Sequence, residues 1–178
     1  MANIAAVALA AFPGHVAVME PLTTRSIAEL LALHAAVTEE LRARNVLRSA
    51  NNPTGDLAEY LFCSAFGWAQ ENNSAKAFDA RGDDGTRYQI KGRRIHRRNG
   101  SRQLSAIRHP DGFDILAAVL FDENYRIVRA ALIPAAVVRG HSKFIEHTNS
   151  HKFLLRDAIW DATGVVDATE QLRTVEGL

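Results

Sequence analysis

Three residues that are close in the sequence have side chains suited to hydrolysing a phosphate ester. Gln89 and Lys91 follow Asp79 by ten and twelve residues, and the turn signal Gly82-Asp83-Asp84-Gly85 lies between them. A hairpin with this turn places Asp79 beside Gln89 and Lys91. Alternation along a strand puts Gln89 and Lys91 on one face while Ile90 points into the core. An acid, an amide oxygen and a lysine then converge, as metal-assisted phosphodiester hydrolysis requires.

A second carboxylate precedes this hairpin in the chain. Residues 56–66 carry apolar side chains at helical spacing, and Glu59 flanks that apolar stripe. We therefore expect a helix that holds Glu59 across the edge of the core instead of in bulk water. From there the carboxylate can approach the Asp79 side of the hairpin.

These residues resemble the motif of the PD-(D/E)xK nuclease superfamily, which has the restriction endonuclease-like fold. Phe78-Asp79 is similar to its Pro-Asp element, Gln89-Ile90-Lys91 to its (D/E)xK element, and Glu59 to the glutamate that many members carry on a preceding helix. The resemblance covers about residues 50–135 and extends to a small bacterial group with this fold. It implies an endonuclease that hydrolyses DNA with Mg²⁺, for which Mn²⁺ can substitute. The implied metal ligands are Asp79, Gln89, the Ile90 carbonyl and Glu59. The implied role of Lys91 is to orient or deprotonate the attacking water molecule.

Two departures from the motif carry different weight. Phe78 in place of Pro has little effect, because that position of the motif requires only an extended backbone. Gln89 in place of an acid, by contrast, removes one negative charge from the metal site. An amide oxygen binds a hard cation more weakly than a carboxylate does. The alternative is therefore a catalytically inactive nucleic-acid-binding or assembly module on the same fold. In that case Asp79 could simply pair with Arg81 or Arg87.

A basic segment follows the candidate site. Residues 81–108 contain nine arginines and lysines against two aspartates, a net charge of +7, whereas the whole chain carries only +1. Arginine favours bidentate contacts with phosphate groups, so we expect this segment to bind nucleic acid. A solvated loop or an acidic protein partner is the alternative. The candidate nucleic-acid-binding residues are Arg93, Arg94, Arg97, Arg98, Arg102 and Arg108.

The pattern of apolar residues predicts a mixed α/β fold, and the resemblance implies that its core is restriction endonuclease-like. We expect a mixed central sheet flanked by helices, an N-terminal helix and a helical C-terminal tail. Residues 1–19 read as an N-terminal extension or arm, unless Met19 is the biological start, and residues 20–178 as a single nuclease-like domain. The predicted elements are helices at 26–46, 56–66, 101–107, 135–139 and 167–175, and strands at 77–80, 86–93, 113–121 and 125–133.

The amino-acid composition limits the cellular compartment and the partners that we expect for this protein. The single cysteine, Cys63, excludes an internal disulfide framework and favours a cytoplasmic protein. No apolar run reaches the roughly 20 residues of a membrane helix, so no membrane partner is expected. His141, His147 and His151 lack nearby cysteines, and no zinc is expected. Cleavage of both DNA strands would call for a homodimer, because one such site cuts one strand.

Overall fold

The computed structural model describes residues 21–71 and 77–175. The chain divides into two units, residues 1–39 and 40–178, and each is described by itself. The predicted arm at residues 1–19 lies outside the described residues. Helix α1 (Ile27–Ala43) begins at the predicted capping box, in which the Ser26 N–H donates to the Glu29 carboxylate at 2.8 Å and the Ser26 hydroxyl accepts from the Glu29 N–H at 3.3 Å.

A mixed sheet of six strands organises the second unit, so the predicted α/β class with a mixed, helix-flanked sheet is confirmed. The strand order is β1-β2-β3-β4-β5-β8, in which only β3 and β4 pair in parallel. The strands are β1 (Ala69–Gln70), β2 (Ala80–Arg81), β3 (Arg87–Arg94), β4 (Ile115–Phe121), β5 (Ile127–Pro134) and β8 (Val166–Asp167). Strand β4 is almost entirely buried, as its continuous apolar sequence predicts.

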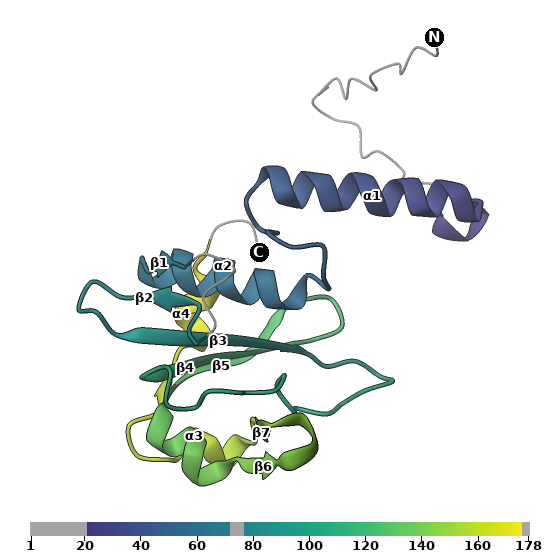
Figure 1. Ribbon diagram of the computed structural model, residues 1–178. Coiled ribbons are helices and arrows are strands. Elements are labelled where there is room, and N and C mark those ends of the chain that lie inside the picture. Colours follow the sequence, from purple (N-terminus) through teal and green to yellow (C-terminus); the bar gives the residue numbers. More distant parts are fainter. Residues whose placement is uncertain (1–20, 72–76, 176–178) are drawn as a thin grey trace. The chain divides into compact units, whose positions relative to one another are not determined.

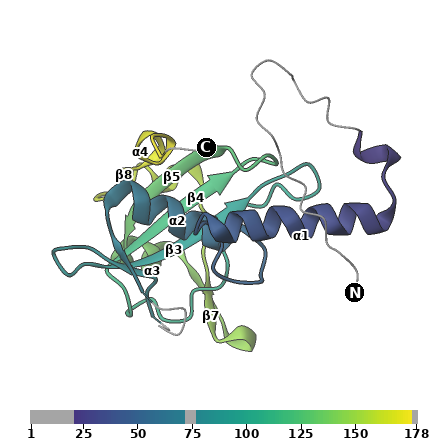
Figure 2. The ribbon, with the colours of Figure 1, turned by 90° about the horizontal axis from the view of Figure 1, so that it is seen from above.

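Helices α2 (Thr54–Phe66) and α4 (Thr169–Arg173) cover one face of this sheet (Figures 1 and 2). Their buried side chains, such as Phe62 and Leu172, pack with Ile90 of β3 and with β4 and β5. Gly92 allows α2 to approach β3 closely, since a Cβ there would lie 2.6 Å from the Thr54 carbonyl oxygen. This close packing fixes the height of α2, and hence of Glu59, above β3.

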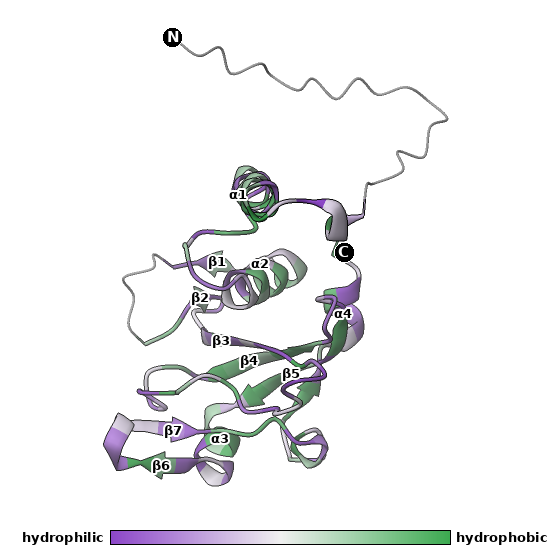
Figure 3. Cartoon of the chain, turned by 90° about the vertical axis from the view of Figure 1, so that its right-hand side faces the viewer, coloured by the Kyte–Doolittle hydropathy of each residue, from purple (hydrophilic) through white to green (hydrophobic). Residues whose placement is uncertain are grey.

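The opposite face carries α3 (Ala135–His141) and the hairpin of β6 (Lys143–Ile145) and β7 (Ser150–Lys152). Its core contains Leu116, Leu120 and Ile133 from the sheet, with Val138 and Phe153 above them. Figure 3 shows the contrast between the strongly hydrophobic β4 and β5 and the more hydrophilic β3. Strand β3 is therefore the place where polar side chains enter the sheet.

The connection from β3 to β4 differs from the prediction. The sequence predicts a helix at residues 101–107, but this segment is irregular, with isolated bridges from Gln103 to Leu154 and from Ile107 to His151. Leu104 and Ile107 are both 1% exposed and pack into the second face. Their burial between the sheet and residues 151–155 favours an extended path over a helical turn.

The C-terminal helix is present but shorter than predicted. It is α4, where the Asp167 carboxylate accepts the Thr169 N–H at 2.9 Å, while Glu170 pairs with Arg173. Among the described residues, no helix is long and apolar enough to cross a membrane.

Candidate functional site

Asp79 lies immediately before β2, where that strand pairs with β3. Its N–H donates to the Tyr88 carbonyl at 2.7 Å, and its carbonyl accepts the Glu71 N–H at 2.9 Å. One carboxylate oxygen, Oδ2, accepts the Ile90 N–H at 2.6 Å and also the Gln89 side-chain amide. Because β2 has only two residues, the carboxylate takes the backbone donor of β3 that a longer β2 would have paired. The predicted meeting of Asp79 with Gln89 is therefore present.

Gln89 and Lys91 lie on one face of β3, since side chains alternate along a strand. Ile90 between them is 3% exposed and packs on the α2 side. Lys91 makes no side-chain hydrogen bond or ion pair with the described residues. It is half-buried, two residues after Gln89 on the same face of β3.

The two arginines that offered Asp79 a purely structural partner are bound elsewhere. Arg87 forms a two-pronged interaction with Asp114, at 2.8 and 3.0 Å, and these hydrogen bonds lower the pKa of Asp114 to about 2. Arg81 faces Glu71 at 3.6 Å. The Asp79 carboxylate is thus bonded by amides and by neither of these cations.

Glu59 reaches the same region from α2. Its carboxylate accepts the Gln70 side-chain amide at 2.7 Å and lies 3.9 Å from the Arg48 guanidinium. The pKa of Glu59 is raised, first because burial penalises the charged form and then because of the negative charge of Asp79. The Gln70 hydrogen bond and Arg48 act in the opposite direction but do not outweigh burial. Burial and a like charge nearby therefore both disfavour the ionised form of Glu59.

Cys63 lies one helical turn after Glu59. Burial, followed by the charge of Glu59, raises the pKa of its thiol to about 11. The thiol is therefore protonated at neutral pH and is not an activated nucleophile.

Comparison with protein-family models and with curated proteins found no match.

Two N–H donors, from Gln89 and Ile90, face the Asp79 carboxylate, so a cation here would have to displace the Gln89 amide nitrogen. Among residues 21–71 and 77–175, no group of three or more His, Cys, Asp or Glu side chains could hold a metal ion. A metal held here would draw on the carboxylates of Asp79 and Glu59 and on the oxygens of the Gln89 amide and the Ile90 backbone. Rotation of the Gln89 amide by 180° would bring its oxygen to Asp79 in place of its nitrogen, since the two ends have the same size. Oxygen donors of this kind fit Mg²⁺.

Two residues of the site carried no recognisable signal in the sequence. Gln70 comes from the two-residue β1, and Arg48 precedes α2. The Asp56 carboxylate fixes the chain at Arg48 by accepting the N–H groups of Arg48 and Ser49, at 2.8 and 2.7 Å. The side chain of Arg48 then reaches both Glu59 and the Glu71 carbonyl.

The basic segment divides into bound and uncommitted arginines. Arg94 donates to the Glu123 carbonyl at 2.8 Å and lies over the Tyr125 ring, and Arg102 pairs with Asp157 at 2.8 Å. Arg97 is 3.9 Å from the Glu123 carboxylate and is 91% exposed. The Arg93 side chain donates to the Ser101 carbonyl at 2.9 Å and to no other described residue. Within the described part of the chain, the side chains of Arg98 and Arg108 have no such partner.

The raised pKa of Glu59 predicts an effect on stability. Below about pH 4, the ordinary pKa of glutamate, Glu59 is protonated in both the folded and the unfolded chain. As the pH rises through the raised folded-state pKa, ionisation costs the folded chain stability. Glu59→Gln removes this cost and can still accept from Gln70. We expect the variant to have a higher Tm than the wild type at pH 7–8 and an equal Tm near pH 4.

Thermal unfolding followed by circular dichroism at both pH values measures this difference. Glu123→Gln is the matched control, because it removes an exposed carboxylate whose only ion pair with the described residues is the long contact with Arg97. A Glu59→Gln variant that is less stable at pH 7 would show that the Arg48 contact dominates.

Proposed function

We propose that the chain is a metal-dependent deoxyribonuclease with a restriction endonuclease-like core. The order of α2, the β2–β3 hairpin and the parallel strand β4 agrees with the helix-then-hairpin core that the sequence resemblance implies. The observation that carries the proposal is the Asp79 carboxylate, bonded to Gln89 and to the Ile90 N–H where β2 leaves β3. Glu59 lies close enough for its pKa to respond to the charge of Asp79.

The metal ligands in this proposal are Asp79, the Gln89 amide oxygen, the Ile90 carbonyl and Glu59. The two backbone groups of a strand residue point to the same side, so the Ile90 carbonyl lies on the side of β3 where its N–H meets Asp79. When bound, Mg²⁺ would polarise the phosphate and lower the pKa of a water molecule.

The remaining chemistry belongs to side chains of this chain. Lys91 orients the attacking water and stabilises the negative charge that develops on the phosphate oxygens. A bond forms between the water oxygen and phosphorus while the bond from phosphorus to the ester oxygen breaks, and the departing oxygen takes up the proton that the water releases. Arg93 and Arg98 hold neighbouring phosphate groups.

The direct experiment incubates purified protein with supercoiled plasmid in Mg²⁺, in Mn²⁺ and in EDTA. Nicked or linear product in both metals and none in EDTA supports the proposal. Intact plasmid, linear duplex and branched DNA in all three conditions would refute the proposed activity.

Two such sites are needed to cut both strands of a duplex, so we also propose that the protein acts as a homodimer. The molar mass of the protein–DNA complex in solution tests this. The single cysteine agrees with action in the cytoplasm.

Gln89→Glu tests the metal site. In EDTA the new carboxylate faces Asp79 without an amide donor, so we expect a lower Tm than that of the wild type. Added Mg²⁺ should raise the Tm of the variant more than that of the wild type, with about tenfold tighter binding in a calorimetric titration. Asn124→Asp adds the same charge in the exposed turn after β4 and serves as control. If Mg²⁺ changes neither protein, no metal binds here.

The alternative function is a catalytically inactive nucleic-acid-binding or assembly module. The hydrogen bond between the Gln89 amide and Asp79 favours it, because this pair satisfies the carboxylate without a cation. Under this alternative, DNA binding persists in EDTA and Lys91→Ala has no effect, whereas Arg98→Ala weakens binding. Failure to retain DNA at low salt would favour an acidic protein partner for the basic segment.

A further inference from the structure

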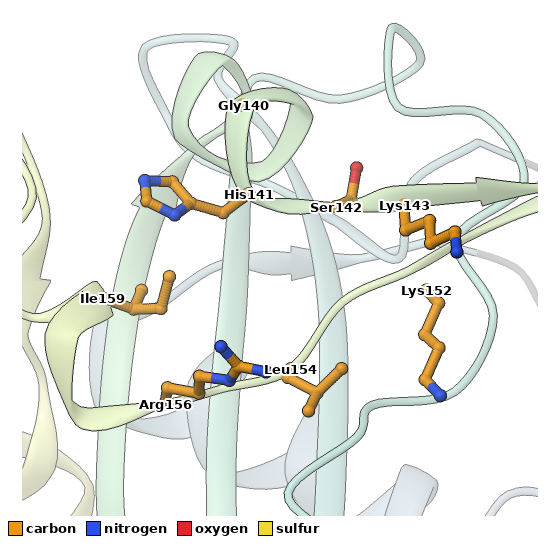
Figure 4. A pocket seen from close by; sticks show the side chains of 8 residues that line it. All are labelled: Gly140, His141, Ser142, Lys143, Lys152, Leu154, Arg156 and Ile159. Atoms are coloured by element: carbon orange, nitrogen blue, oxygen red, sulfur yellow. The ribbon is translucent and has the colours of Figure 1, made fainter.

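A second polar pocket lies away from Asp79, between the end of α3, the β6–β7 hairpin and the chain that follows β7. Its volume is about 410 Å³. Figure 4 shows its lining, to which four basic side chains contribute: His141, Lys143, Lys152 and Arg156. None of its lining residues is acidic, and Leu154 and Ile159 supply an apolar part of the wall.

The positive charges of this pocket are not compensated by the fold. Lys143 and Lys152 are directly opposite each other in the two-stranded sheet, an arrangement of like charges that destabilises a β-hairpin. Asp157, the acid next to Arg156, is bonded instead to Arg102 and Arg129, at 2.8 and 3.3 Å. Glu146 belongs to the turn at the other end of the hairpin.

No ion pair with a described residue involves any of the four basic groups. The hairpin thus holds Lys143 and Lys152 together against their mutual repulsion. Arg156, which lines the same pocket, has no acidic partner among the described residues. An anion in the pocket would remove this repulsion. Its ligand is therefore expected to be negatively charged and rich in hydrogen-bond acceptors.

We propose that this pocket binds a phosphate group, carried either by a free nucleotide or by a nucleic-acid strand. Lysine and arginine together provide the donors that phosphate oxygens accept. The four basic side chains are exposed and can reach a ligand from solvent, while Leu154 and the buried Ile159 form an apolar wall. The volume is within the range of small-ligand pockets. The proposal concerns binding only and does not depend on hydrolysis at Asp79.

The position of the pocket favours a nucleic-acid strand as the source of the phosphate. Leu154 in its wall forms a bridge with Gln103. Gln103 in turn lines another pocket together with Gly92 and Arg93, next to Lys91 on β3. One pair of chain segments therefore separates the two pockets. A nucleic-acid strand that contacts Arg93 can continue across the two segments joined by the Gln103–Leu154 bridge to the pocket of Lys143, Lys152 and Arg156.

The experiment measures binding of three probes in EDTA at fixed ionic strength: inorganic phosphate, adenosine monophosphate and a labelled 12-nucleotide single strand. We expect Lys143→Gln/Lys152→Gln and Arg156→Gln each to weaken binding about tenfold. In a separate salt series with the strand, the slope of log binding constant against log salt should become shallower by about one for each phosphate group that the variant no longer binds. Arg126→Gln is the matched control, because Arg126 is exposed and lies outside this pocket.

A measurement of folding separates weaker binding from a damaged structure. Without any probe, the double lysine variant should have a Tm equal to or above that of the wild type, since neither charge of the repulsive pair remains. Loss of strand binding alone identifies a nucleic-acid site, and loss of nucleotide and phosphate binding identifies a small-ligand site. Binding of all three probes that is equal in the variants and in Arg126→Gln overturns the proposal.

Discussion

Asp79→Asn is expected to reduce DNA cleavage about a hundredfold to a thousandfold while leaving the fold intact. Asparagine has the size of aspartate, and its side-chain oxygen can still accept the Ile90 N–H. The negative charge, however, is removed from the group proposed as the central metal ligand. Metal affinity and cleavage should therefore fall together, whereas the Tm in EDTA should change little.

Lys91→Ala should lower cleavage by a similar factor through a different step. It removes the ammonium group proposed to orient water and stabilise charge, but leaves the carboxylates. We therefore expect kcat to fall while Mg²⁺ binding is retained. Mg²⁺ affinity therefore separates the two variants: it should fall in Asp79→Asn, which loses a metal ligand, and stay unchanged in Lys91→Ala, which loses the group that orients the water.

Asp83→Asn is the matched control for Asp79→Asn. Asp83 is an exposed residue of the turn between β2 and β3, four residues along the chain. Its substitution changes the net charge equally and should leave kcat/KM unchanged. If Asp79→Asn and Lys91→Ala both cleave plasmid as rapidly as this control, then any nuclease activity of the chain resides elsewhere.

Local patterns predicted the part of the site that lies within one hairpin. The turn at 82–85, the alternation in β3 and the apolar run of β4 are each properties of neighbouring residues, and they correctly predicted that Asp79 meets Gln89. Arg48 and Gln70 were missed because each reaches Glu59 through tertiary structure and no periodicity marks them.

The irregular path between β3 and β4 shows a second limit of sequence reasoning. Residues 101–107 have spacing that suits a short helix, yet Leu104 and Ile107 are buried between the sheet and the segment after β7. Tertiary burial decided the conformation there. A parallel strand pair requires a long crossover, but nothing in the sequence requires that crossover to be helical.

Some basic residues that the sequence suggests for phosphate binding form ion pairs within the fold. The sequence separates a basic segment at 81–108 from an acidic one at 157–178, which holds five acids against one arginine. In the fold, Asp157 of the acidic segment pairs with Arg102 of the basic one. Part of the apparent phosphate-binding charge therefore holds the structure together. Arg93, Arg98 and Arg108 have no acidic partner among the described residues and remain the better candidates for DNA contact.

Gly92→Ala is expected to destabilise the protein by about 1–3 kcal/mol, the range for overpacking a close contact. The added Cβ would lie 2.6 Å from the Thr54 carbonyl oxygen and 3.0 Å from the Ala58 Cβ. Backbone cannot yield as a side-chain tip can, so α2 must move away from β3. Chemical unfolding at pH 7 measures the change in the free energy of unfolding.

This substitution also tests whether α2 positions Glu59 for the site. Displacement of α2 would weaken the repulsion between Glu59 and Asp79 and should lower kcat along with stability. Gly55→Ala is the matched control on the same helix, where an added Cβ meets nothing within 4 Å. Alanine stabilises a helix relative to glycine by up to about 1 kcal/mol, so this control should be neutral or more stable. Equal stability of the two variants would mean that the contact between Gly92 and Thr54 does not set the distance of α2 from the sheet.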